Sequence, residues 1–230
     1  MAANRITKKW LQNHLHYNWW KYLLVAALSV MGIDMLFTST AYKPPEEKKL
    51  ELYVCSGYVD SIALQNELWP QIQTRYPDQE ELIVMNIDLS SGDMYANMQF
   101  TTYAAAQQGD VLLLPQAEVY KMAGEGADLA FLELTPFIES GVIDPKDIDL
   151  SAGKLSSEAG EMGLYAIPAD SLHGLNAFYG VPDGSMLCLT SYGGNDEHAA
   201  GLLNMLIELY KSEKPENHEA PDEAPVTIFN

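Results

Sequence analysis

QQGDVLLLPQAEVYKMAGEGA, residues 107–127, changes from an apolar run to a helical pattern across a single dipeptide. Gly109-Asp110 precedes the apolar residues 111–114, and Pro115-Gln116 ends the run. Consecutive apolar residues of this kind predict a strand that is buried on both faces, as in a parallel sheet. The segment that follows, 116–123, predicts a short helix. A buried strand that turns directly into a helix indicates an α/β fold with helices on both faces of the sheet.

Two further strand–helix units precede this stretch. KLELYVCSG (49–57) and EELIVMNIDLS (80–90) predict strands, and each is followed by a predicted helix, over 58–78 and 91–109. Asp60 or Ser61 suits the N-cap of the first helix; for the second helix, the expected caps are Ser91 or Asp93 at the start and Gly109 at the end. The apolar stripe expected to bury the first helix consists of Ile62, Leu64, Leu68, Trp69 and Ile72.

The remaining segments complete one predicted lobe. A short helix is expected at 135–140, and MGLYAIPADS (162–171) and SMLCLTSYG (185–193) predict two strands. The closing helix, 195–213, carries an apolar stripe of Ala199, Leu202, Leu203, Leu206, Leu209 and Tyr210. The pattern therefore predicts a single three-layer α/β lobe with a mainly parallel sheet over 50–212. Residues 213–230 are rich in proline and acids and predict a disordered acidic tail.

The N-terminal region contains a predicted transmembrane anchor at 22–42. KYLLVAALSVMGIDMLFTSTAY (21–42) is long and apolar enough to span a bilayer, and Asp34 is expected near its outer end. The flanking aromatic residues, typical of membrane interfaces, are Trp19, Trp20, Tyr22 and Tyr42. The basic residues before the span are Arg5, Lys8, Lys9 and Lys21. The positive-inside rule therefore predicts a cytoplasmic and interfacial segment at 1–21 and an extracellular C-terminal domain.

A cleaved signal peptide is the alternative to this anchor, because Ser39-Thr40-Ala41 offers small residues to a peptidase. The long aromatic WLQNHLHYNWW (10–20), which predicts an interfacial helix, favours an uncleaved anchor in the cell membrane. A stiff charged spacer, KPPEEKK (43–49), is predicted to follow the span.

Charge is distributed unevenly within a formal net charge of −19. Residues 1–49 hold seven basic and three acidic residues, a net of +4, and the remaining residues hold six basic and 29 acidic ones, a net of −23. An acidic body repels nucleic acid, which is therefore excluded as a partner.

Cysteine usage and motifs argue against catalysis and metal binding. Cys55 and Cys188 both lie in apolar runs. They are predicted to be two buried thiols or, as the alternative, a disulfide between core strands. We expect no metal site and no cofactor, because the sequence has no cysteine or histidine cluster with zinc spacing and no phosphate-binding loop. Asp170, Ser171 and His173 are too close in sequence to form a catalytic triad, so a non-enzymatic protein is predicted.

The order of four segments resembles the extracellular solute-binding proteins of bacterial ABC importers, the sugar-type periplasmic-binding-protein family. These segments are AAAQQGDVLLLPQAEVYKMAGEGA (104–127), FLELTPFIESGVID (131–144), GLYAIPADS (163–171) and SYGGNDEHAAGLLNMLIEL (191–209). The resemblance covers about residues 48–211. Members of the family have a whole second lobe where this chain has only residues 169–184. The resemblance therefore implies a solute-binding lobe that lacks its second half, and hence weak capture of a solute.

Ligands of parallel α/β sheets bind beyond the carboxyl ends of the strands, which places the candidate site. The candidate ligand-binding residues are Ser56, Gly57, Tyr58, Ser91, Asp93, Tyr95, Pro115, Gln116 and Tyr165. Six aromatic residues are expected to be exposed near strand ends, where they can stack on a sugar: Tyr58, Tyr95, Tyr165, Phe178, Tyr179 and Tyr192. The alternative is that half or more of them pack in the layer that covers the sheet.

Two functions follow as hypotheses. The first is weak binding of a small polar, sugar-like solute, or an accessory or sensor role beside a transporter, with an ABC permease or another membrane protein as partner. The second is a structural or interaction protein of the cell envelope that keeps the fold and binds no solute.

Overall fold

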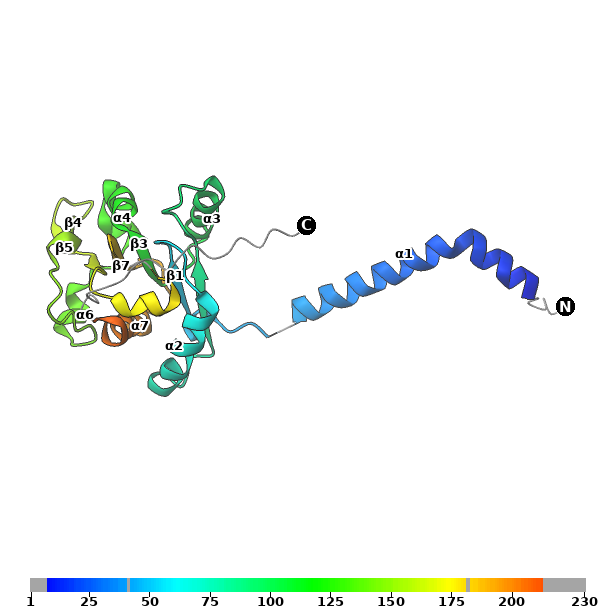
Figure 1. The fold of residues 1–230 in the computed structure, drawn as a ribbon, viewed down its shortest axis with the longest axis horizontal. Coiled ribbons are helices and arrows are strands. Elements are labelled where there is room, and N and C mark those ends of the chain that lie inside the picture. Colours follow the sequence, from blue (N-terminus) through cyan, green and yellow to red (C-terminus); the bar gives the residue numbers. More distant parts are fainter. Residues whose placement is uncertain (1–7, 41, 181–182, 213–230) are drawn as a thin grey trace. The chain divides into compact units, whose positions relative to one another are not determined.

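The computed structural model describes residues 8–40, 42–180 and 183–212, and the chain forms two compact units that divide between Lys43 and Pro44 (Figure 1). The predicted acidic tail at 213–230 lies outside the described residues.

The first unit is one long helix, α1 (Lys8–Thr40). Its section His16–Thr40 is, among the described residues, the one helix long and apolar enough to cross a membrane, and none of it is buried. Polar side chains in this section bond within the helix: Ser29 Oγ donates to the Val25 carbonyl at 2.8 Å and Thr40 Oγ1 to the Leu36 carbonyl at 2.7 Å. The predicted interfacial segment and the apolar segment form one unbroken helix, and the start of the span at residue 22 stays a prediction.

The second unit contains a five-stranded sheet in the order β2-β1-β3-β7-β6. Its strands are β1 (Lys49–Val54), β2 (Glu81–Asn86), β3 (Val111–Pro115), β6 (Ala166–Pro168) and β7 (Ser185–Leu189). Strand β1 pairs in parallel with β2 and β3, while β7 is antiparallel to both β3 and β6. Four of the five strands therefore share one direction, and the predicted α/β fold with a mainly parallel sheet is confirmed.

Helices cover both faces of this sheet and produce three layers (Figure 1). On one face, Leu50, Leu52 and Val54 pack with α2 (Ser61–Arg75) and α7 (Asp196–Tyr210). On the other face, Tyr53 and Cys55 pack with α3 (Met94–Ala105) and α4 (Gln116–Met122). Alternate residues of β1 thus supply two separate cores.

Shorter elements connect these layers. They are η1 (Glu46–Lys48), η2 (Ala123–Glu125), α5 (Ala127–Ala130), α6 (Thr135–Glu139), η3 (Ser151–Gly153), β4 (Lys154–Ser156), β5 (Met162–Leu164) and η4 (His173–Phe178). The predicted strand at 162–171 is therefore two strands: β5 pairs with β4 in a separate ribbon, and β6 joins the main sheet.

Local sequence explains how α2 and α3 begin. The Asp60 carboxylate accepts from the Ala63 N–H at 3.0 Å and the Asp93 carboxylate from the Tyr95 N–H at 3.0 Å, as N-caps. The predicted end of α3 at Gly109 is wrong, because the helix stops at Ala105. Gly109 instead leads into β3 with a φ of 93°, where a Cβ would lie 3.2 Å from the Tyr53 ring.

Two residues of the predicted apolar stripes face solvent. Ile62 of α2 is 73% exposed and Leu209 of α7 is 39% exposed, whereas Leu64, Leu68 and Ile72 are fully buried. Ile62 lies in the first turn of α2 and Leu209 in the last turn of α7.

The two cysteines are free, so the disulfide alternative is wrong and the buried-thiol alternative is confirmed. Strand β3 lies between them, because the Cys55 N–H donates to the Leu113 carbonyl and Cys188 is the register partner of Leu112. Two strand spacings place their Cα atoms roughly 10 Å apart, beyond the reach of about 7 Å that a disulfide allows. Burial raises the pKa of both thiols.

Gly153 provides a stability test, because a Cβ at this position would overlap the Ala166 carbonyl oxygen of β6. Gly153→Ala should reduce the free energy of unfolding by about 1–3 kcal/mol, since backbone atoms must move. We expect the Tm of the full chain to fall by roughly 2–12 °C. Gly124→Ala is the matched control, because no atom lies within 4 Å of its Cβ position. Equal Tm values for both variants would show that β6 does not pack on Gly153.

Candidate functional site

The carboxyl ends of β1, β2 and β3 meet at one edge of the sheet, as predicted. We call this edge the carboxyl-end rim, made of residues 56–58, 88–93 and 115–116. The register pairs Val54 with both Asn86 and Leu113, so the three strands end at a common level. The Asn86 side chain ties two of the tips together, because its Nδ2 donates to the Val54 carbonyl at 3.1 Å and to the Gly57 carbonyl at 2.8 Å.

The tip of β1 presents an exposed aromatic pair. Gly57 has a φ of 79° and turns the chain away from the sheet. Tyr58, 62% exposed, then lies beside Tyr179, 63% exposed, with ring centroids 6.3 Å apart. The Asp60 N–H donates to the Phe178 carbonyl at 2.9 Å and holds these two distant segments together. Ser56 is 5% exposed, and its Oγ has no hydrogen-bond partner among the described residues.

The β2–α3 loop uses its predicted site residues mainly for its own shape. The Asp88 carboxylate accepts from the Ser90 and Ser91 N–H groups at 3.0 and 3.3 Å, and Ser91 Oγ donates to the Asp88 carbonyl at 2.8 Å. Asp93 caps α3. Tyr95 is 71% exposed, and Ser91 and Asp93 are exposed as well.

Pro115 and Gln116 occupy the predicted place at the end of β3. The Gln116 N–H donates to the Gly184 carbonyl at 2.9 Å, and its Nε2 donates to the Tyr120 hydroxyl at 2.7 Å. The side chain of Gln116 is therefore engaged with its own helix. The ligand-binding roles of these rim residues remain predictions.

Tyr165 is not part of the rim. It is 5% exposed, packs in the core beneath α3 and α4, and directly precedes β6. Because β6 runs in the same direction as β3, a residue before β6 lies toward the amino ends of the strands. The expected exposure of Tyr165 is wrong, and so is that of Phe178, which is 8% exposed.

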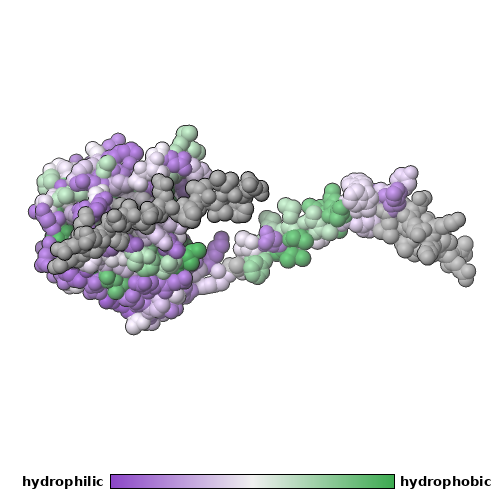
Figure 2. All heavy atoms as spheres, in the orientation of Figure 1, coloured by the Kyte–Doolittle hydropathy of each residue, from purple (hydrophilic) through white to green (hydrophobic). Residues whose placement is uncertain are grey.

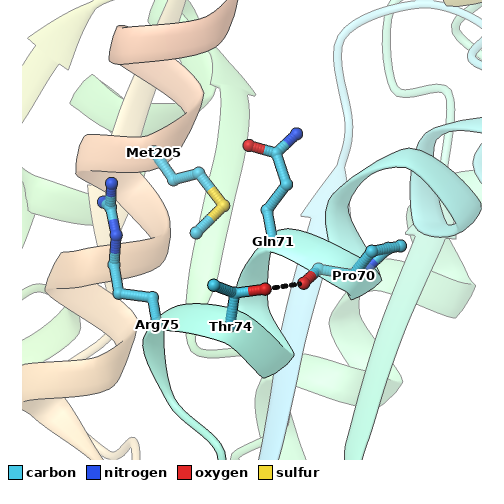
Figure 3. A pocket seen from close by; sticks show the side chains of 5 residues that line it. All are labelled: Pro70, Gln71, Thr74, Arg75 and Met205. Carbon is cyan, nitrogen blue, oxygen red and sulfur yellow. Dashed lines mark hydrogen bonds between the residues drawn. The ribbon is translucent and has the colours of Figure 1, made fainter.

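Three hollows among the described residues are lined by residues outside the rim, and one of them begins at Met94, next to Asp93 of the rim. One, of about 350 Å³, lies between α2 and α7 and is lined by Pro70, Gln71, Thr74, Arg75 and Met205 (Figure 3). Thr74 Oγ1 donates to the Pro70 carbonyl at 2.8 Å, and Arg75 forms an ion pair with Glu208 at 2.9 Å. Of the polar side chains that line this hollow, those of Thr74 and Arg75 are thus already engaged.

The third hollow, of about 310 Å³, lies at the amino ends of β1 and β3, and sequence reasoning missed it. Lys49 Nζ bridges Glu46 and Glu51 at 2.8 and 2.9 Å. The other oxygen of Glu51 accepts from the Gly109 N–H at 2.7 Å and from the Tyr53 hydroxyl at 3.1 Å. Asp110 Oδ2 accepts from the Glu51 N–H at 2.7 Å. The sequence does contain an indication of this hollow. Lys49 and Glu51 are two residues apart in a predicted strand, so the two charged side chains lie on the same face.

The electrostatics of this hollow are dominated by burial. Burial raises the pKa of Asp110 to about 6, the Glu51 N–H hydrogen bond opposes this rise, and the nearby Glu51 carboxylate adds to it. Burial also raises the pKa of Tyr192 to about 12. No group of three or more His, Cys, Asp or Glu that could hold a metal ion occurs among the described residues. The charged groups hold the start of β1 to the start of β3, which is a structural role.

Comparison with known proteins adds little. No known protein family matches the sequence, and no curated protein does. Among solved structures, a protein named extracellular solute-binding protein family 1, from Alicyclobacillus acidocaldarius subsp. acidocaldarius DSM 446, is similar to this chain. The two sequences are 18% identical, and the TM-score of the two structures is 0.36. The match covers 56% of this chain and 29% of that chain, so this chain matches less than a third of that protein. A similarity this low supports no argument about function.

Asp110→Asn tests the buried charge network through pH. A carboxyl whose pKa is raised from 3.8 to about 6 in the folded state stabilises the fold at low pH, and that stability is lost as pH rises from about 4 to about 6. The variant should therefore exceed the wild type in free energy of unfolding by about 1–2 kcal/mol at pH 7–8, with a smaller difference near pH 4.5. Thermal unfolding of both proteins between pH 4.5 and pH 8 measures this difference in stability. Asp78→Asn, at an exposed turn position, serves as control, and a constant offset between Asp110→Asn and wild type would contradict the assignment.

Proposed function

We propose that this protein is a membrane-anchored, non-enzymatic binding lobe that contacts a small polar, sugar-like solute weakly at the carboxyl-end rim. Its role is accessory or sensory, beside a transporter of the ABC importer class. The observation that carries this proposal is the Tyr58–Tyr179 pair, two exposed rings at 6.3 Å beside the tip of β1. Kinship with extracellular solute-binding proteins rests on the ordered sequence segments.

The chemistry of the rim suits a sugar better than an ion. Tyrosine rings stack on the apolar face of a sugar, and their hydroxyls bond its polar edge. The Ser56 hydroxyl, two residues from Tyr58, is buried and therefore does not reach a solute at this tip, so the exposed contacts come from the two rings. Asp60 caps α2, so a carboxylate already occupies the helix N-terminus where an anion would bind. The described lobe offers one side of a site, and we therefore expect a Kd on the order of 1 mM.

A solute titration tests this proposal. The full chain in nanodiscs is titrated with a panel of mono- and disaccharides, amino acids and short peptides, and followed by calorimetry. Tyr58→Ala and Tyr179→Ala should each weaken binding by about five- to ten-fold, because each removes one stacking surface. Leu129→Ala is the control, since Leu129 is exposed but belongs to α5. Absence of heat across the panel would remove the solute function.

The second candidate is an interaction protein of the cell envelope that keeps the fold and binds no solute. Two observations favour it: the polar groups of the rim are mostly engaged within their own loops, and α3 exposes Met94, Tyr95 and Met98. Silence in the solute titration, together with binding of a protein partner, would select this candidate.

Membrane anchoring through α1, single-pass with a cytoplasmic N-terminus, is part of both proposals. The apolar section His16–Thr40 supports it, as do the internal hydrogen bonds of its hydroxyls, because a bilayer offers no other partners. The basic residues before the span support the orientation. The bilayer would hold α1 where an ABC permease or another membrane protein can reach it.

Labelling of introduced cysteines tests the orientation. A membrane-impermeant maleimide on intact cells should label Ala159→Cys, an exposed position, and should label Asn4→Cys only after permeabilisation. Native Cys55 and Cys188 are buried and give a low background. Mass spectrometry should find the intact N-terminus in the membrane fraction. A mature chain that begins at Tyr42 would show a cleaved signal peptide instead.

A further inference from the structure

Helix α3 carries an apolar stripe on its solvent side, in addition to its buried face. Ala96 and Phe100 pack in the core, while Met94 and Met98 are 75% and 64% exposed. A shallow hollow of about 360 Å³ runs along the exposed side and is lined by Met94, Asn97, Met98, Thr101 and Thr102. These positions follow i, i+3, i+4, i+7 and i+8, which form one face of a helix. We call them the α3 stripe; the hydrophobic surface near the top of Figure 2 lies over this helix.

The polar members of the α3 stripe satisfy their donors within the helix. Asn97 Nδ2 donates to the Asp93 carbonyl, Thr101 Oγ1 to the Asn97 carbonyl and Thr102 Oγ1 to the Met98 carbonyl, each at 2.8 Å. Threonine hydroxyls bonded in this way leave their methyl groups to form much of the exposed surface. The stripe is therefore more apolar than its composition suggests, and a helix that is apolar on two faces is typical of one covered on both.

Charge indicates what could cover the stripe. Residues 76–120 contain no lysine or arginine, and the exposed Asp93 lies at the start of α3 with Asp88 in the preceding loop. Residues 50–230 carry a net charge of −23. A second copy of this acidic lobe and an anionic lipid surface would both be repelled. A partner with basic residues beside an apolar stripe would be attracted.

We propose that the α3 stripe docks an amphipathic helix of a partner protein, with an apolar stripe bordered by lysine or arginine. Met94 and Met98 would form the deformable contact surface, because methionine side chains adapt to varied partner shapes. Asp88 and Asp93 would pair with the basic border at the start of α3. This inference rests on the second proposed function, the interaction protein of the cell envelope. It requires no solute, because the docking surface is on α3 and the proposed solute contact is at the tip of β1.

A model peptide provides the test. The full chain in zwitterionic nanodiscs is titrated with a fluorescent Leu/Lys amphipathic peptide about five helical turns long. A Leu/Glu peptide of the same pattern serves as the charge control, and empty nanodiscs serve as reference. We expect the Leu/Lys peptide to bind in a salt-sensitive manner and the Leu/Glu peptide not to bind.

Substitutions at exposed methionines locate the contact. Met94→Ser combined with Met98→Ser should weaken binding by about ten-fold, whereas Met162→Ser, at a methionine of β5 that is 67% exposed, should leave it unchanged. Thermal unfolding confirms that each variant is folded. Equal affinity in all variants, equal binding of the Leu/Glu peptide, or no binding would overturn the proposal. Self-association that the double variant abolishes would also overturn it, because a second copy would then cover the stripe. The solute titration is independent of each of these outcomes.

Discussion

Strand β1 is the element on which the rest of the second unit depends, because it pairs in parallel on both sides and supplies both cores. Leu50, Leu52 and Val54 face α2 and α7, while Tyr53 and Cys55 face α3 and α4. Removing this strand would separate β2 from β3 and divide the sheet. At its start, Glu51 binds Lys49, Tyr53 and Gly109, so buried polar contacts hold β1 to β3 where apolar packing ends. A carboxylate at this depth is acceptable because each of its oxygens has a partner.

This arrangement gives the two ends of the sheet different characters. At the amino ends, charged groups face one another and serve the fold, and the raised pKa of Asp110 reflects their burial. At the carboxyl ends, polar groups are used mostly to shape loops, and tyrosine rings remain exposed. Exposed rings on one side of a site provide contact area without enclosure, which is consistent with weak binding or with docking of a partner.

Sequence reasoning performed best where the apolar pattern alone determines structure. The run 111–114 is buried on both faces, and strands at 50–54 and 82–86 lie parallel beside one another, as their patterns predict. It failed for Tyr165 and Phe178, because an aromatic residue beside a strand is equally compatible with solvent and with a covering core. It also missed the contact of Glu51 with Gly109, since these residues are 58 positions apart and only the pairing of β1 with β3 brings them together.

By itself, the sequence determined the class of fold, the apolar N-terminal helix and the acidic character of the lobe, because these follow from local periodicity and composition. Tertiary structure alone decided the antiparallel insertion of β7, the separation of Cys55 from Cys188 by β3, and the meeting of Tyr58 with Tyr179. The physical reason is that each of these features depends on contacts between segments far apart in the chain. The local sequence of a segment does not specify which distant segment it contacts. That contact forms only when the two cores pack on the sheet.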